Sequence, residues 1–209
     1  MKFGFFAAAA VALLVASCGD SGLPIPGTQA VEIKADDRVH GSPNAPVTIV
    51  EYASMTCPHC AAFNRDVIPQ LTKDYIDTGK VKLVFRDFPL MQIHPEALMS
   101  AMAVNCAGEQ GKYWQFHDKV FREQYNKGDD VIRMKATDLK KWAKDIGVDQ
   151  AKFDQCLDSE KFKNEVMKDK ADGDAAGVQG TPTFFINGRV MGGAQQYPEY
   201  RKLIDELLK

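Results

Sequence analysis

Two cysteines separated by two residues, in Cys57-Pro58-His59-Cys60, come shortly after an apolar, β-branched segment at residues 47–52. Thiols at this spacing can close a small disulfide, and the first becomes a stable thiolate if the pair opens a helix. Pro58 suits a first helical turn, because the N–H that proline lacks has no partner there. The segment predicts a central strand, a loop and a helix that begins at a redox-active pair of thiols.

Two other uses of the pair stay open from the residues alone. Cys57 and Cys60 could form a purely structural disulfide, or they could bind a metal. A tetrahedral metal site needs two further ligands, and neither a second CxxC nor an HxxxH is present in the sequence. A redox role for the pair is therefore favoured.

The first residues predict export. Lys2 precedes an uncharged apolar run at residues 3–15, which has the length of a secretory signal rather than of a membrane span. The run ends in Val15-Ala16-Ser17-Cys18, which resembles the lipobox of bacterial lipoproteins. We expect residues 1–17 to be a signal peptide and Cys18 to carry lipid, although an ordinary signal peptide with a chance cysteine is the alternative.

Export places the chain in an oxidising compartment, where disulfides persist. Once Cys18, Cys57 and Cys60 are assigned, Cys106 and Cys156 remain, and we expect them to form a structural disulfide. Two buried free thiols are the alternative. A net charge of -2 argues against a nucleic-acid partner, since binding phosphates needs a basic surface.

Strand signals lie at both ends of the chain and helix signals lie between them. Asn187-Gly188 between two apolar runs is a strong hairpin signal. Pro69 predicts a kink in the first helix. Arg86-Asp87 is interpreted as a turn after the second strand. The predicted organisation, in order, is a tether at 18–38, the first part of a sheet domain at 39–94, a helical insertion at 95–176, and the second part of the sheet domain at 177–209.

Four segments resemble DsbA-like thiol:disulfide oxidoreductases. They are Glu51-Tyr52 with the CxxC, Phe116-His117-Asp118-x-x-Phe121, the segment from Gly147-Val148-Asp149 to Cys156-Leu157, and Gly180-Thr181-Pro182-Thr183-Phe184 followed by Asn187-Gly188. The resemblance covers roughly residues 40–209. It implies an α/β protein with a thioredoxin fold and an inserted all-helical subdomain.

The resemblance also implies roles for individual residues. Cys57 forms a mixed disulfide with a client protein, and Cys60 resolves it. His59 stabilises the Cys57 thiolate as a cation in the first helical turn. A cis bond before Pro182 turns the Thr181 backbone toward the CxxC, where it can pair with an extended client.

Glu51 is a carboxylate in an otherwise apolar strand, and a buried acid costs free energy unless it is neutral or paired. In related proteins an acid near this place helps to move the proton of the buried thiol, and we expect this of Glu51. An exposed strand end is the alternative. His40, His94 and His117 are expected to be structural.

The function that we expect is donation of the Cys57–Cys60 disulfide to reduced, unfolded, exported proteins by a monomer that needs no bound cofactor. The family implies reoxidation by a quinone-linked membrane partner of the DsbB type. A disulfide isomerase or reductase is the nearest alternative, because isomerase-like members often carry Thr before the cis proline, as Thr181 is here. A non-enzymatic metal- or client-binding module is the third.

Overall fold

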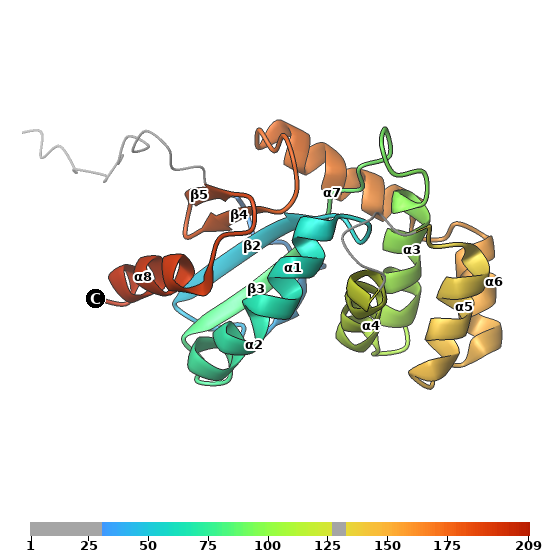
Figure 1. The fold of residues 1–209 in the computed structure, drawn as a ribbon, viewed down its shortest axis with the longest axis horizontal. Coiled ribbons are helices and arrows are strands. Elements are labelled where there is room, and N and C mark those ends of the chain that lie inside the picture. Colours follow the sequence, from blue (N-terminus) through green and yellow to red (C-terminus); the bar gives the residue numbers. More distant parts are fainter. Residues whose placement is uncertain (1–30, 127–132) are drawn as a thin grey trace, which may run out of the picture.

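The computed structural model describes residues 31–126 and 133–209, which form a five-stranded sheet with helices on both faces and a helical insertion at one end (Figure 1). The strands are β1 (Arg38–His40), β2 (Val47–Ala53), β3 (Val81–Asp87), β4 (Thr183–Ile186) and β5 (Arg189–Gly192). Their order in the sheet is β1-β3-β2-β4-β5. The predicted fold class is confirmed, and β2 is the central strand.

The two halves of the sheet come from opposite ends of the chain. β2 is parallel to β3 and antiparallel to β4, with Tyr52 opposite Thr183. β4 and β5 form the predicted hairpin at Asn187-Gly188, whose φ angles of 44° and 84° are those of a turn that matches the twist of the strands. The pairing of β2 with β4 brings the CxxC and the Thr181-Pro182 loop to the same end of the sheet.

Helical segments follow β2 and fill the predicted insertion. They are α1 (Pro58–Asp66), α2 (Ile68–Leu71), a π-helical turn η1 (Thr72–Ile76), α3 (Ala97–Gly108), α4 (Tyr113–Asn126), α5 (Ala136–Asp145), α6 (Gln150–Asp158), α7 (Lys163–Ala175) and α8 (Tyr197–Leu207). The predicted kink at Pro69 is confirmed, because the helix is interrupted at Val67, between α1 and α2, just before this proline. None of the described helices is long and apolar enough to cross a membrane.

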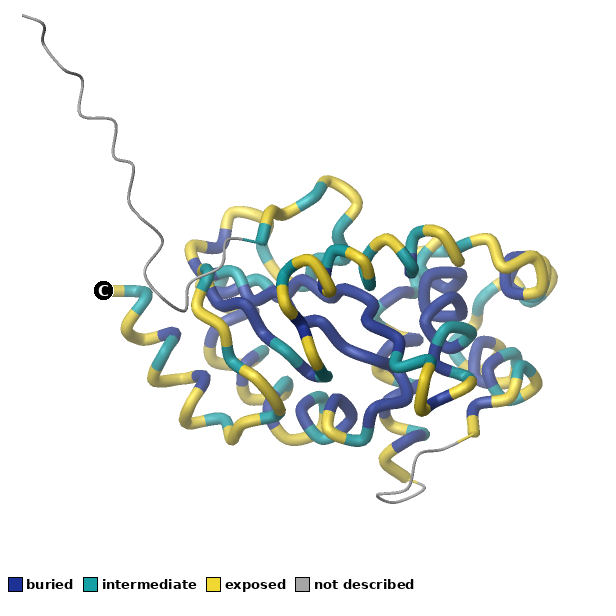
Figure 2. Tube along the Cα trace, turned by 90° about the horizontal axis from the view of Figure 1, so that it is seen from above, coloured by how far each residue is buried: buried dark blue, intermediate teal, exposed yellow. Residues whose placement is uncertain are grey.

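Each face of the sheet has its own apolar core. Ile49 of β2 packs with Phe63 of α1 and Tyr200 of α8 on one face. On the other face Tyr52 packs with Phe88 and Phe185, and α7 approaches so closely that a Cβ on Gly173 would lie 2.7 Å from the Phe88 ring. The central strands β2 and β3 are accordingly buried along almost their whole length (Figure 2).

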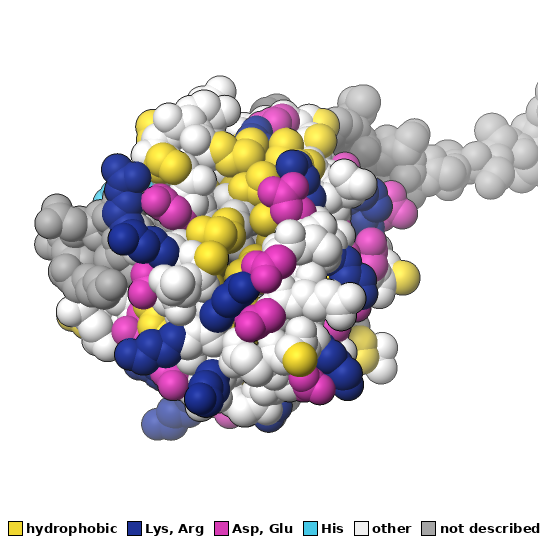
Figure 3. All heavy atoms as spheres, turned by 90° about the vertical axis from the view of Figure 1, so that its right-hand side faces the viewer, with side chains coloured by type: hydrophobic (Ala, Val, Ile, Leu, Met, Phe, Trp, Pro, Cys, Tyr) yellow, Lys and Arg dark blue, Asp and Glu magenta, His cyan; other side chains and the backbone are white. Residues whose placement is uncertain are grey.

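A third core joins the active-site helix to the insertion. Cys57, Cys60 and Ala61 belong to the same buried cluster as Phe116 and Phe121 of α4. These two aromatic rings are therefore part of the core. The outer face of the insertion is more polar than this core. Side chains of Lys and Arg are mixed there with those of Asp and Glu around apolar areas (Figure 3).

Two predictions are wrong: the turn at Arg86-Asp87 and the residue at which the folded part of the chain begins. Arg86 and Asp87 were interpreted as a turn, but both are buried residues of β3. Arg86 is neutralised by Asp37, with 2.8 Å between Nη2 and Oδ2 and side chains that are 2% and 3% exposed. The folded part therefore begins before residue 39, in the stretch predicted as tether, and β1 itself was not predicted.

Candidate redox site at the start of helix α1

Cys57 lies where the central strand leads into α1. It is the N-cap residue of the helix, with φ −83° and ψ 121°, and Pro58 occupies the first helical position as predicted. Its backbone N–H donates to the Ser54 carbonyl at 3.0 Å, and its own carbonyl accepts from the Ala61 N–H at 3.1 Å. No side chain caps this helix, so the Cys57 sulphur lies beside amides that have no intrahelical partner.

The two thiols have opposite acidities. The pKa of Cys57 is lowered to about 5, first by a hydrogen bond with the Cys60 side chain; Thr181 and the backbone amides of Cys60 and His59 act in the same direction, while burial opposes them. Burial raises the pKa of Cys60 well above its usual value, and the neighbouring Cys57 and Glu51 raise it further. Cys57 is thus a thiolate at neutral pH and Cys60 a thiol.

The loop before β4 forms the opposite wall of the site. The Thr181–Pro182 peptide bond is cis, as predicted. In the thiol form Cys57 Sγ donates to the Thr181 carbonyl at 3.3 Å. The Pro182 carbonyl is held by the Gly193 N–H at 2.8 Å. A main-chain segment therefore faces the reactive sulphur directly.

Glu51 lies beneath the thiols. Side chains alternate along a strand, so Glu51 shares the α1-facing side of β2 with Ile49, and it is 2% exposed. Burial, and then the Cys57 charge, raise the pKa of Glu51 to about 8. Its Oε1 atom has no hydrogen-bond partner within the described part of the chain. The alternative of an exposed strand end is excluded, and the carboxyl group is neutral at pH 7.

Comparisons with known proteins agree with this geometry. A thioredoxin family model matches residues 34–206. Disulfide bond formation protein D of Bacillus subtilis is 32% identical over 177 residues, which are 82% of this chain and 77% of that protein. This chain is a DsbA-like member of the thioredoxin family. It has thiol:disulfide oxidoreductase relatives over most of its length, and its predicted family is confirmed.

Solved structures place the DsbA-like chain in the same group. The crystal structure of oxidised BdbD from Bacillus subtilis has a TM-score of 0.74 at 30% identity, covering 82% of this chain and 92% of that chain. Wolbachia pipientis alpha-DsbA1 has a TM-score of 0.71 at 32% identity, covering 84% and 92%.

A Na(+)/H(+) antiporter of Salinispora tropica, NhaA 3, also matches this DsbA-like chain, at 36% identity over 153 residues. The match covers 73% of this chain, and the chain spans 22% of the length of that antiporter.

His59 contributes to the site of the DsbA-like protein through its backbone. The His59 amide is among the groups that lower the pKa of Cys57, whereas the side chain points out of the fold and is exposed. The stabilising role that we predicted for the imidazole stays a prediction.

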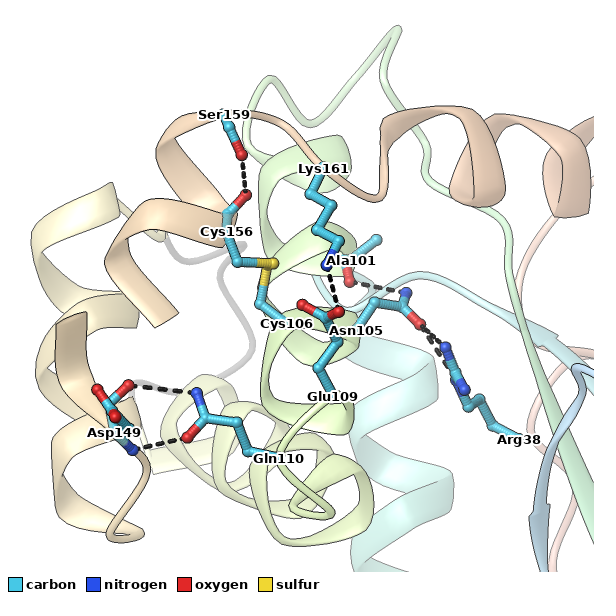
Figure 4. Close-up of a disulfide and its surroundings, with 10 residues drawn as sticks. All are labelled: Arg38, Ala101, Asn105, Cys106, Glu109, Gln110, Asp149, Cys156, Ser159 and Lys161. Carbon is cyan, nitrogen blue, oxygen red and sulfur yellow. Dashed lines mark hydrogen bonds and ion pairs between the residues drawn. A yellow bond between two sulfur atoms is a disulfide. The ribbon is translucent and has the colours of Figure 1, made fainter. Parts of the chain in front are cut away.

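Cys106 of α3 and Cys156 of α6 are joined by a disulfide with 5.8 Å between their Cα atoms (Figure 4). The predicted pairing is confirmed, and the alternative of two buried thiols is excluded. Cys57 and Cys60 are the free cysteines of the described residues. The disulfide ties the first helix of the insertion to a later one.

One part of the site was missed. Thr56, Ser54 and His94 form a buried hydrogen-bonded chain beside the CxxC. The prediction that His94 is structural is compatible with this hydrogen bond. Two hydroxyl residues next to the CxxC were the available signal, but their partner lies 38 residues further along the chain. The predicted signal peptide and Cys18 lie outside the described residues.

Proposed function

We propose that this protein is a dithiol oxidase that donates its Cys57–Cys60 disulfide to reduced proteins in the cell envelope. The observation that carries the proposal is the lowered pKa of Cys57. A stabilised thiolate favours the reduced CxxC, and a stable reduced form makes the disulfide a strong oxidant. Relatives that are named for disulfide bond formation support it.

The exchange begins when a client thiolate attacks the Cys57 sulphur of the oxidised protein. A new bond forms between the client sulphur and Cys57, and the bond between Cys57 and Cys60 breaks. The electron pair goes to Cys60, which leaves as a thiol because the neutral Glu51 carboxyl supplies a proton. Glu51 then takes a proton back from solvent. The Thr181 backbone holds the client as an added strand.

A second client thiolate then attacks the client sulphur of the mixed disulfide, and Cys57 leaves as a thiolate. The client has lost two electrons and closed a disulfide, while the CxxC has gained two. Cys57 is the better leaving group in this step, since a thiol of lower pKa leaves faster. The CxxC is itself the redox group, so the proposal requires no bound cofactor.

The proposed setting follows from the N-terminal residues. A lipid on Cys18, after removal of residues 1–17, would anchor the protein to a membrane facing the bacterial periplasm. The tether would let the monomer reach unfolded clients. A quinone-linked membrane protein of the DsbB type would return the electrons and restore the disulfide.

The redox state in living cells tests the direction. Alkylation trapping is expected to find Cys57 and Cys60 mostly oxidised, and equilibration with glutathione is expected to give a strongly oxidising potential. A pair that is mostly reduced in cells would support the second candidate, an isomerase or reductase. Thr181 before the cis proline favours that candidate, because isomerase-like members often carry Thr there.

A further inference from the structure

A chain of buried hydroxyls leads from the active-site loop to an imidazole. Ser54 Oγ lies 2.9 Å from Thr56 Oγ1, and Thr56 Oγ1 lies 2.9 Å from His94 Nδ1. The three residues are 1%, 0% and 7% exposed. Each hydroxyl therefore relies on this chain for its hydrogen bonds, because water has almost no access to it.

The chain begins at the residue that touches both cysteines. The Ser54 carbonyl accepts the Cys57 N–H at 3.0 Å. The Ser54 amide faces the Cys60 sulphur and offsets part of the rise in the pKa of Cys60. Because no side chain caps α1, the conformation of the loop at residues 54–57 sets how the Cys57 sulphur meets the first amides of the helix.

The chain ends on a residue that is fixed from another part of the fold. The His94 N–H donates to the Leu90 carbonyl at 2.9 Å, and the His94 carbonyl accepts from the Ala97 N–H at 3.1 Å, where α3 begins. The backbone that carries the ring is thus fixed at the start of the helical insertion. A buried hydrogen bond from such a fixed group restrains the loop in direction as well as in distance.

We propose that Ser54, Thr56 and His94 are positioning residues of the redox site. They hold the loop at residues 54–57 so that the Cys57 sulphur stays against the amides at the start of α1. The inference takes from the proposed function only that Cys57 is the reactive thiol. It applies to either direction of electron flow.

Substitutions at Thr56 test the hydroxyl. Thr56→Val keeps the shape of the buried side chain and removes the hydrogen bonds, whereas Thr56→Ser keeps the hydroxyl. In the reduced protein we expect Thr56→Val to raise the pKa of Cys57 by about half a unit or more, a threefold change in the ionisation equilibrium, which converts to a potential about 15 mV more negative. Thr56→Ser should titrate like the wild type. Thiolate absorbance near 240 nm reports the titration.

Substitutions at His94 test the imidazole. His94→Asn places a polar atom near the position of Nδ1 and His94→Gln near that of Nε2, so Asn should preserve the Cys57 titration better than Gln. His40→Leu is the matched control. His40 lies in β1 and packs on Trp114, so this substitution should leave the Cys57 titration unchanged.

The inference would be overturned if Thr56→Val is folded, as judged by near-ultraviolet circular dichroism, and its Cys57 titrates with the wild-type pKa. If Thr56→Val does not fold, equal titrations in His94→Asn and His94→Gln would overturn it. Neither measurement involves a client or a reoxidant. Failure here is therefore distinct from failure of the proposed oxidase function, which the redox state in cells decides.

Discussion

At the scale of single residues, the site works through unequal treatment of two chemically identical thiols. Cys57 meets amides at a helix start, whereas Cys60 is enclosed one turn later beside a neutral carboxyl group. A pKa near 5 for Cys57 places its ionisation below neutral pH, so the reduced site holds one negative charge at pH 7. Glu51 stays protonated because its own burial and then that charge oppose its ionisation.

Glu51→Gln is expected to change how stability depends on pH. The pKa of Glu51 is raised from 4.5 to about 8, so the unfolded chain ionises first as pH rises, and the reduced wild type loses stability between these values. Glutamine does not ionise. The reduced variant should match the wild type at pH 4 and exceed it by roughly 5 kcal/mol above pH 8. Urea unfolding at several pH values measures this, and a difference that does not vary with pH would contradict it.

His59→Ala is expected to raise the pKa of Cys57 by less than about one unit, because the exposed ring acts through water while the backbone amide is retained. The difference between variant and wild type should shrink as salt is added. Absorbance titration near 240 nm in low and high salt checks this. A shift that is insensitive to salt would show that the charge of the ring is not the cause.

At the scale of elements, the sequence pattern predicted what repeats regularly and missed what is short or paired across distance. The side-chain alternation in β2 and β3 and the Asn187-Gly188 turn are local patterns, and the structure has the elements that they predict. β1 has only three residues and lies between turn-forming neighbours, so it is a strand because it pairs with β3 and not because of a local sequence pattern. Arg86 looked like a turn residue because its neutralising partner, Asp37, is 49 residues away.

Removal of the disulfide between α3 and α6 is expected to destabilise the insertion. Cys106 and Cys156 are separated by 50 residues, and cross-linking a loop of that length is worth about 4 kcal/mol through the entropy of the unfolded chain. The double substitution Cys106→Ala and Cys156→Ala should lower the free energy of unfolding by about that amount, measured in urea. A loss below about 1 kcal/mol would contradict the entropic account.

At the scale of the whole molecule, the sheet domain and the insertion meet through buried polar groups. Asn105 of α3 donates to Asp87 of β3 at 2.8 Å, and Arg38 of β1 donates to Asn105 and to Glu165 of α7. The Asp87 amide donates to Asp169 of α7 at 3.2 Å. Burial and then Asp169 raise the pKa of Asp87 to about 8, and burial raises that of Asp169 to about 6.

Asp87→Asn is expected to make this junction less sensitive to pH. Both carboxyl groups hold protons more tightly in the folded chain, so wild-type stability falls as pH rises from about 4 to 8. The amide removes the larger share of that fall, because the pKa of Asp87 is raised further than that of Asp169. Thermal unfolding from pH 5 to 8 should show a flatter profile than in the wild type. Asp66→Asn, at an exposed ion pair, is the control and should leave the slope unchanged.

The contact between Cys57 and Thr181 joins residues that are 124 positions apart. β4 begins two residues after Thr181 and pairs with β2, so the site is complete only when this strand is in place in the sheet. A chain that emerges from an export channel with its N-terminus first would therefore expose its two thiols before it had any wall to present to them. The site would gain its opposite wall only after the segment through β4 had emerged, and a copy truncated before β4 would lack that wall.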